Sequence, residues 1–440
     1  MPRTRANSKL ETRNSKPKQI VPLLLAWFAA NARDLPWRRT RDPYAIWVSE
    51  IMLQQTQVKT VIPYWERWLT ELPTIQALAK APSEKIHKLW EGLGYYTRVR
   101  NMQKAAQQIL EKHAGQFPET FDAILDLPGI GRYTAGAISS IAFNQPTPIL
   151  DGNVIRVLTR VFGIATDPRE KQTNAQLWQL AKELVETASE QKTLMHDVRR
   201  AKPPPLLGER AGVRAVVKHK SQNACSHLNQ SLMELGALIC TPRSPQCEVC
   251  PVQKLCVARK ENLQEQLPNL GKRAAATERR FLAFIVERDG KFLVRQRPAG
   301  VVNAHLWEFP NVEVGARLSP AAASPPANNA EKFQTVLATS PLRLGQPRSA
   351  TEAAQTFGWA LQSAKPLCTI KHSITRYRIT LEAWRAGTPV SAPARNGTRL
   401  RNPPGRRPAL QGRWLTLPEL RKLSFPSAHK KILSALAEAG

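Results

Sequence analysis

Between two helical patterns the chain reads Leu127-Pro128-Gly129-Ile130-Gly131-Arg132-Tyr133-Thr134-Ala135. Gly129 and Gly131 permit a tight hairpin between two helices, because glycine adopts backbone conformations that other residues avoid. The backbone N–H groups at the start of the second helix then face outward, where they can bind a phosphate without a charged side chain. The same turn could also be a plain connection between helices, so its meaning depends on the sequence around it.

The chain on both sides of this hairpin is predicted to be helical. From Val21 to about Phe143, apolar residues recur at spacings of three and four, as they do on one face of a helix. Proline and glycine separate the segments, and further helical patterns extend to Ile239. Strand signals are scarce in this part. The pattern therefore predicts an all-α domain that contains the hairpin.

Four cysteines follow this helical region within 17 residues: Cys240, Cys247, Cys250 and Cys256. Four thiolates so close together, on a chain bent by prolines, predict one tetrahedral sulfur cage that zinc or an iron–sulfur cluster could fill. Disulfide pairing is the alternative, and it would be disfavoured in an intracellular protein. The spacing alone does not choose the metal.

The charge of the chain points to a polyanionic partner. Lys and Arg number 64 and Asp and Glu number 34, which gives 64 − 34 = +30 over 440 residues. Nucleic acid is the usual partner of so basic a protein. Three stretches supply 17 of the 30 charges, namely residues 1–20, 193–222 and 385–413. We therefore expect the folded part to be less basic than the total suggests.

The hydrophobic pattern argues against an integral membrane protein and against a secreted disulfide scaffold. The longest apolar candidate, Val21 to Ala30, is far shorter than the roughly 20 residues that span a bilayer. The basic N-terminus is not followed by an apolar region with a cleavage site, so we expect no secretory signal. We expect a monomer in the bacterial cytoplasm or nucleoid, with no membrane partner.

The remaining sequence divides by composition. A smaller α+β domain is predicted near the C-terminus, because two alternating segments flank a turn at Arg288-Asp289-Gly290. The full predicted division is a disordered basic tail at 1–20, a helical domain at 21–262 with an insertion at about 193–222, a linker at 263–278 and the α+β domain at 279–440.

Two acidic residues are candidates for acid–base chemistry. Glu50 lies among apolar side chains in Ile46-Trp47-Val48-Ser49-Glu50-Ile51-Met52-Leu53, where burial would raise its pKa and suit a general acid. Asp151 follows Pro148-Ile149-Leu150 and precedes a helix. The plainer interpretations are an exposed helix acid for Glu50 and a helix N-cap for Asp151. Neither residue decides the function alone.

Three further stretches accompany the hairpin and the cysteines in order: Trp47 to Val58, Gly92-Leu93-Gly94-Tyr95-Tyr96 and Leu150-Asp151-Gly152-Asn153-Val154. Together these five motifs resemble the adenine DNA glycosylases, the MutY family. The resemblance covers roughly Val21 to Cys256 apart from the insertion, and continues more loosely through 279–440. It implies a helix-hairpin-helix glycosylase fold in which Cys240, Cys247, Cys250 and Cys256 hold one 4Fe-4S cluster.

The resemblance also implies a substrate and a mechanism. The family flips adenine mispaired with 8-oxoguanine or guanine out of duplex DNA and hydrolyses its N-glycosidic bond. Glu50 would protonate the departing base, and Asp151 would stabilise or trap the oxocarbenium-like sugar. Tyr133 would help to position Asp151. Tyr133 also stands where endonuclease III relatives carry a lysine that forms a Schiff base, so a monofunctional glycosylase without lyase activity is expected.

Other residues match the substrate contacts of the family. Trp37, Arg38 and Gln230 match its adenine pocket, although Trp37 could simply pack in the core. Gln55 and Tyr95 match residues that wedge into the duplex, and Gly129 and Gly131 match the hairpin that grips phosphate. Gln54, on the same predicted helix as Glu50 and Gln55, offers a further amide to a base.

The C-terminal stretch Leu306-Trp307-Glu308-Phe309-Pro310 resembles the Nudix-like domain with which the family inspects 8-oxoguanine. Residues 279–440 lack the glutamate-rich magnesium-binding helix of Nudix hydrolases, so recognition is expected rather than hydrolysis. Many members carry Phe-Ser-His on the recognition loop, whereas Lys371-His372-Ser373 is followed here by Ile374-Thr375-Arg376. We assign contacts with the oxidised base to Ser373 and Thr375.

Three rival functions remain open at this point. A bifunctional endonuclease III-like enzyme is disfavoured by Tyr133 and by the extra domain. A non-catalytic DNA-binding protein is disfavoured because both Glu50 and Asp151 are present. A degraded enzyme would follow if the insertion disrupted the helical domain, but long surface loops cost little closure entropy.

Overall fold

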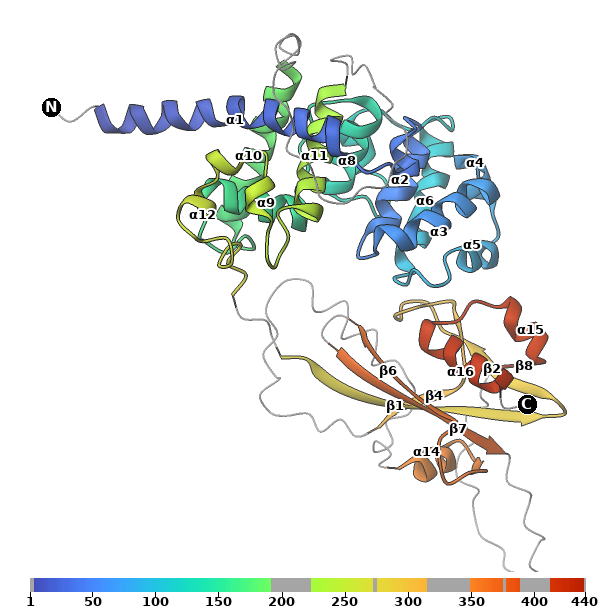
Figure 1. Ribbon diagram of the computed structural model, residues 1–440. Helices are drawn as coiled ribbons and strands as arrows, with labels where there is room; N and C mark the ends of the chain where they lie inside the picture. Colours follow the sequence, from blue (N-terminus) through green and yellow to red (C-terminus); the bar gives the residue numbers. More distant parts are fainter. Residues whose placement is uncertain are drawn as a thin grey trace, which may run out of the picture. The chain divides into compact units, whose positions relative to one another are not determined.

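The computed structural model describes residues 4–190, 223–271, 275–314, 349–374, 377–387 and 412–438. The chain divides into two compact units (Figure 1). The first unit is Met1–Lys80 with Asn101–Arg273, and the second is Ala81–Arg100 with Ala274–Gly440. The predicted insertion at 193–222 lies outside the described residues. No described helix combines the length and the apolar character that crossing a bilayer requires.

The first unit is helical, as the apolar spacing predicts. Its helices are α1 (Thr4–Asn31), α2 (Pro43–Leu53), α3 (Val58–Glu71), α4 (Ile75–Lys80), α6 (Thr97–Lys112, which begins in the other unit), α7 (Phe121–Leu125), α8 (Arg132–Phe143), α9 (Gly152–Phe162), α10 (Lys171–Glu190), α11 (Ala224–Leu238) and α12 (Val257–Lys260). Helix α11 contacts α1, α8, α9 and α10. Its Leu228, Leu232 and Leu235 are buried, so it forms the centre of this unit.

The N-terminal residues differ from the predicted disordered tail at 1–20, because α1 begins at Thr4. Ile20 is buried, and the Lys16 ammonium donates to the Val161 carbonyl at 2.9 Å and lies over the Phe162 ring. A lysine can pack its aliphatic stem while its charge is satisfied elsewhere. The basic composition therefore does not prevent this end of the helix from packing.

The second unit contains a mixed sheet built around one long strand. Strand β1 (Thr277–Arg288) pairs antiparallel with β2 (Lys291–Gln296) and β4 (Asn311–Val314), and parallel with β7 (Tyr377–Gly387). The shorter strands are β3 (Trp307–Glu308), β5 (Ala360–Leu361), β6 (Cys368–Ile374) and β8 (Arg413–Leu415). The turn after β1 places Asp289 and Gly290 at φ 51° and 69°. Both angles are positive, as a two-residue hairpin requires.

Alternating residues of β1 supply the two cores of this unit. Ala283 and Ile285 pack with residues of α15 (Leu417–Lys422) and α16 (Ser427–Glu438). Phe284 and Val286 pack with residues of α14 (Ala350–Thr356) on the opposite face. Figure 1 shows these helices on the two sides of the sheet. This arrangement confirms the predicted α+β domain.

Both boundaries of the predicted linker at 263–278 shift. Leu267 is buried, and its carbonyl accepts from the Arg160 side chain at 2.9 Å, so the start of the predicted linker packs on the helical unit. Strand β1 already begins at Thr277. Residues 272–274 lie outside the described part of the chain.

Residues 81–100, which the sequence places in the helical domain, belong to the second unit. They include helix α5 (Ser83–Leu89). The Glu91 carboxylate accepts hydrogen bonds from the Lys88 ammonium at 2.9 Å, the Lys430 ammonium at 3.0 Å and the Phe425 amide at 3.3 Å. These contacts join segments more than 300 residues apart in the chain, which helical periodicity cannot detect.

Candidate active site

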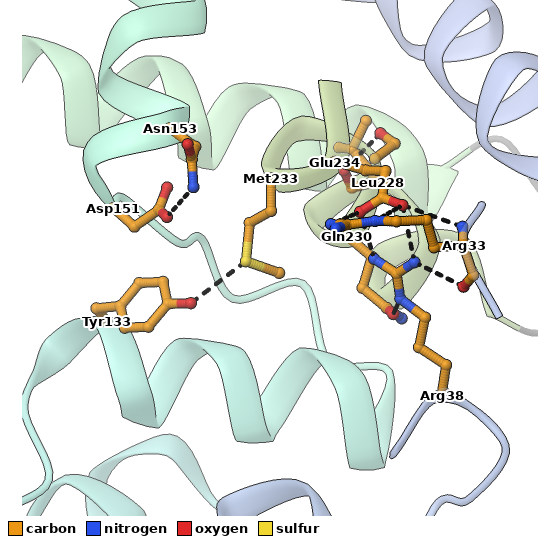
Figure 2. A network of polar contacts seen from close by, with 10 residues as sticks. Arg33, Arg38, Tyr133, Asp151, Asn153, Leu228, Gln230, Met233 and Glu234 are labelled. Atoms are coloured by element: carbon orange, nitrogen blue, oxygen red, sulfur yellow. Dashed lines mark hydrogen bonds and ion pairs between the residues drawn. The ribbon is translucent and has the colours of Figure 1, made fainter. Parts of the chain in front are cut away.

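One cavity of about 710 Å³ in the first unit collects most of the predicted site residues. It is lined by Trp37 and Arg38 of the short helix η1 (Pro36–Arg38), Glu50 of α2, Gln54 and Gln55, Gly129 and Gly131 of the hairpin, Tyr133 of α8, Asp151, and Gln230 and Glu234 of α11. Figure 2 shows Tyr133, Asp151 and the side chains of α11 around this space. The fold therefore places the hairpin and both candidate acids together.

Glu50 is buried in an apolar helix, as the sequence predicts. Every residue from Tyr44 to Met52 is buried, and Glu50 itself is 5% exposed. Burial raises the pKa of the Glu50 carboxyl to about 7, although a hydrogen bond from Tyr133 opposes that rise. Glu50 can therefore hold a proton near neutral pH.

Asp151 caps helix α9 and also faces the cavity. One carboxylate oxygen accepts from the Val154 amide at 2.8 Å. The other accepts from the Asn153 side chain at 2.9 Å (Figure 2). Burial raises the pKa of Asp151, and these hydrogen bonds oppose the rise. The positive end of the helix also favours the ionised carboxylate. The N-cap and site interpretations of Asp151 are therefore compatible.

Tyr133 contacts the other acid. The resemblance gives Tyr133 a role in positioning Asp151, whereas its hydroxyl donates to the Glu50 carboxylate at 3.0 Å. The hydroxyl also lies 3.3 Å from the Met233 sulfur. Burial raises the pKa of Tyr133 well above its ordinary value, so the hydroxyl keeps its proton and acts as a donor.

A second buried carboxylate, Glu234, lines the same cavity and was missed by sequence reasoning. It is 1% exposed and is held by the guanidinium groups of Arg33 and Arg38. Burial alone would raise its pKa, but the hydrogen bonds from the two arginines lower the pKa to about 2. The only sequence signal is that Glu234 follows Gln230 by four residues, which places both side chains on one helix face.

The predicted adenine-pocket residues lie on this wall of the cavity. The Arg38 Nε donates to the Gln230 side-chain oxygen at 3.0 Å. Trp37 is buried with its ring 6.0 Å from that of Trp65 in an edge-to-face arrangement. Trp37 therefore both packs in the core and borders the cavity.

The sequence predicts that Gln54 and Gln55 continue the helix of Glu50, and this prediction is wrong. Helix α2 ends at Leu53, Gln54 is its C-cap, and Gln55 has a φ of 58°. The Gln54 amide lies 3.4 Å from the Thr134 hydroxyl. This turn therefore presents both amides at the cavity from an irregular segment.

The hairpin has the predicted backbone conformation. Gly129 has a φ of 80°, and a Cβ atom there would lie 2.6 Å from the Asn101 side chain. Gly131 is the N-cap of α8, with open space around it. Gly129 is therefore required by conformation and by space, while Gly131 leaves the start of α8 accessible.

Three of the predicted DNA contacts, namely Tyr95, Ser373 and Thr375, belong to the second unit. Tyr95 is 45% exposed with a φ of 48°. Ser373 is exposed on β6, opposite Arg378 of β7. Thr375 lies outside the described residues.

The four cysteines converge as predicted. Cys240, Cys247, Cys250 and Cys256 are free thiols that line one small cavity. Among the described residues, no group of three or more Cys, His, Asp or Glu side chains is placed to hold a single metal ion. The four thiols nevertheless border one shared space, as a set of cysteine ligands must.

Arg156 lies between the four cysteines and the cavity that Asp151 lines. Its guanidinium donates to the Cys240 carbonyl at 2.6 Å and to the Asn153 side-chain oxygen at 2.8 Å. Asn153 in turn donates to Asp151. Arg156 therefore connects the loop of the four cysteines with the residues that cap helix α9.

Three family models match the chain. Residues 48–183 match the HhH-GPD superfamily of base excision DNA repair proteins, 240–256 the iron–sulfur binding domain of endonuclease III, and 282–435 the NUDIX domain. Among curated proteins, an adenine DNA glycosylase of Buchnera aphidicola is 35% identical over 66% of this chain and 74% of its own length. One from Schizosaccharomyces pombe is 34% identical over 68% of each chain.

This chain belongs to the adenine DNA glycosylase family. The human adenine DNA glycosylase is 38% identical over 66% of this chain, and the match spans 56% of the human protein. The chain thus spans little more than half the length of the mammalian adenine DNA glycosylases it matches. The iron–sulfur match also decides the question that the cysteine spacing left open. Residues 240–256, which include the four cysteines, are an endonuclease III-type iron–sulfur binding domain, and its cofactor is a 4Fe-4S cluster.

Proposed function

We propose that this chain is a monofunctional DNA glycosylase of base excision repair. Its substrate is adenine mispaired with 8-oxoguanine or guanine in duplex DNA, and its product is an abasic site. One observation carries the proposal: Glu50 and Asp151 face one cavity beside the hairpin, with different surroundings. Two carboxyl groups held differently can divide the work of acid and charge stabiliser.

The proposed reaction begins when adenine enters the cavity after flipping out of the stack. Glu50 gives its proton to N7 of adenine, and the electron pair of the glycosidic bond moves onto the base as the bond breaks. The sugar becomes an oxocarbenium-like cation, which the Asp151 carboxylate stabilises or traps. Water then adds to the sugar carbon and returns a proton to Glu50. Cys240, Cys247, Cys250 and Cys256 would hold the 4Fe-4S cluster, which would tie together the chain from 240 to 256.

The absence of an amine supports hydrolysis without strand cleavage. Among the described residues that line the cavity there is no lysine. At position 133 a phenol hydroxyl donates to Glu50, where a Schiff base would require a neutral amine. Among these described residues, none offers the amine nucleophile that the rival bifunctional activity needs.

The second unit is proposed to inspect the base opposite adenine. The NUDIX match covers 282–435, and exposed Ser373 offers a hydroxyl at the edge of the sheet. Tyr95 and Gln55 are proposed to fill the space that the flipped adenine leaves. We further propose that the chain acts as a monomer in the bacterial cytoplasm, a reducing compartment that suits cysteines outside disulfides.

A single-turnover experiment tests this proposal. Purified protein with measured iron content is incubated with a duplex that carries one adenine opposite 8-oxoguanine, and the strand is analysed with and without alkali. Cleavage that appears only after alkali is the expected result. Cleavage without alkali would indicate lyase activity, and no cleavage by cluster-loaded protein would reject the proposed function. A duplex with adenine opposite thymine is the substrate control.

A further inference from the structure

We propose that Glu234 is a positioning residue for the base pocket, where it holds Arg33 and Arg38 in place and neutralises part of their charge. This inference rests on the proposed function, because it concerns how the same cavity receives adenine. Neither the motifs nor the family models single out Glu234. The proposal comes from its contacts in the folded chain.

One carboxylate engages both guanidinium groups. Arg33 donates to Glu234 through Nε at 2.8 Å, Nη2 at 2.7 Å and its backbone amide at 3.0 Å. Arg38 donates through Nη1 at 3.2 Å and Nη2 at 3.0 Å. Figure 2 shows the two arginines converging on Glu234. A bidentate carboxylate–arginine contact fixes the plane of the guanidinium as well as its position.

The arrangement extends from Arg38 to an amide. Arg38 Nε donates to the Gln230 oxygen at 3.0 Å, and the Gln230 amino group donates to the Ser226 hydroxyl at 3.0 Å. Both Arg38 and Gln230 line the cavity. Glu234 thus orients donors at the wall that meets a purine edge, without itself needing to touch the base.

Glu234 also sets the electrostatic environment of the general acid. The charged or titratable groups that act on Glu50 are Tyr133 of α8, Asp151 at the start of α9 and Arg38 of η1. Arg38 favours the ionised form of Glu50. Because Glu234 offsets the charge of Arg38 at 3.0 Å, its removal exposes Glu50 to a stronger positive field.

The test compares two glutamate-to-glutamine variants. Glu234→Gln keeps the shape of the side chain and removes its charge. Glu186→Gln is the matched control, since Glu186 forms an exposed pair with Lys182 on α10. Single-turnover excision of adenine opposite 8-oxoguanine is measured from pH 5 to 9, together with iron content and melting temperature.

For Glu234→Gln we expect an excision rate about 10- to 100-fold lower. The alkaline limb of its pH–rate profile should move to lower pH, because the stronger positive field lowers the pKa of Glu50. The control should match wild type in both. A Glu234→Gln protein that loses only melting temperature, with rate and pH profile unchanged, would overturn the proposal. If wild type itself excises no adenine, the proposed function fails instead.

A second variant covers the case in which Glu234→Gln does not fold. Glu234→Asp keeps the charge and shortens the reach to the arginines. We expect a lowered rate with the alkaline limb unmoved, because Arg38 remains neutralised but is held less firmly. Wild-type rates in a folded Glu234→Asp protein would also overturn the positioning role.

Discussion

Glu50 and Glu234 are both buried at the wall of one cavity, yet their carboxyl groups behave in opposite ways. Glu50 is 5% exposed and has a pKa of about 7, whereas Glu234 is 1% exposed and has a pKa of about 2. Burial disfavours the charge of both. The neighbours decide the outcome, since Glu50 receives a neutral hydroxyl and Glu234 receives two guanidinium groups.

This comparison separates two uses of the same side chain. A buried carboxyl with no hydrogen bond from an arginine can hold a proton near neutral pH and give it away. A carboxylate between two arginines stays charged and holds them in place. The cavity therefore contains one glutamate suited to proton transfer and one suited to fixed geometry.

The largest effect is expected for Glu50→Gln, which removes the proton donor and preserves its shape. Single-turnover excision should fall about 10²- to 10⁴-fold, the usual contribution of general acid catalysis. Iron content should remain that of wild type. Excision at wild-type rates would show that Glu50 is an ordinary buried glutamate.

The same variant should gain stability at alkaline pH. The folded pKa of Glu50 lies above its ordinary value of 4.5, so the folded state binds the extra proton between pH 4.5 and about 7. Stability therefore falls as pH rises through this window, and Gln removes that loss. The melting temperature of Glu50→Gln minus that of wild type should be larger at pH 8 than at pH 5.

Glu234→Ala tests the other half of the comparison through stability. It leaves the partly buried guanidinium groups of Arg38 and Arg33 without their buried carboxylate, which should cost about 3–5 kcal/mol. The contribution of Glu234 to the free energy of unfolding changes with pH in the opposite direction to that of Glu50. The folded pKa of about 2 lies below 4.5, so this stabilisation is present above pH 4.5 and is lost as pH falls toward 2.

Denaturant titrations at pH 7 and pH 3 measure this effect. The gap between wild type and Glu234→Ala should be wide at pH 7 and narrower at pH 3. An equal gap at both values would mean that the cost comes from lost packing rather than from the ion pairs.

Tyr133→Phe should widen the difference in pKa between the two glutamates, by a smaller amount than the changes above. The tyrosine hydrogen bond lowers the pKa of Glu50, so its removal raises that pKa further. The alkaline limb of the pH–rate profile should move up, by less than about one unit. A downward movement would mean that the hydroxyl stabilises the protonated acid.

The smallest effect is expected for Met233→Leu. This change removes the sulfur that lies 3.3 Å from the Tyr133 hydroxyl and nearly conserves side-chain volume. Excision should change less than about threefold, since the Glu50 contact is retained. A larger loss in single-turnover rate would give Met233 a role in orienting the hydroxyl.

The sequence was sufficient where the cause of a feature is local. Glu50 is buried because apolar residues surround it on its own helix, and Asp151 caps a helix that begins beside it. Gly129 has the backbone conformation that its turn requires. The four cysteines lie close together in the chain. In each case neighbours within a few residues determine the structure.

The sequence was insufficient where the partner is remote. Glu234 reaches Arg33 across 201 positions, and no spacing rule connects them. Helix α2 ends at Leu53, and the spacing of apolar residues does not indicate the turn that follows it. Residues 81–100 read as ordinary helix, and only their contacts assign them to the second unit.

The discontinuous second unit has a consequence for dissecting the protein. The chain crosses between units at three points, near residues 80, 100 and 273, so no single cut separates them. A truncation after Arg273 would retain Glu91 but remove Lys430 and the Phe425 amide that donate to it. A fragment defined by the C-terminal boundary alone would therefore expose a surface that the full chain covers, and weakened activity in it would not measure lesion recognition alone.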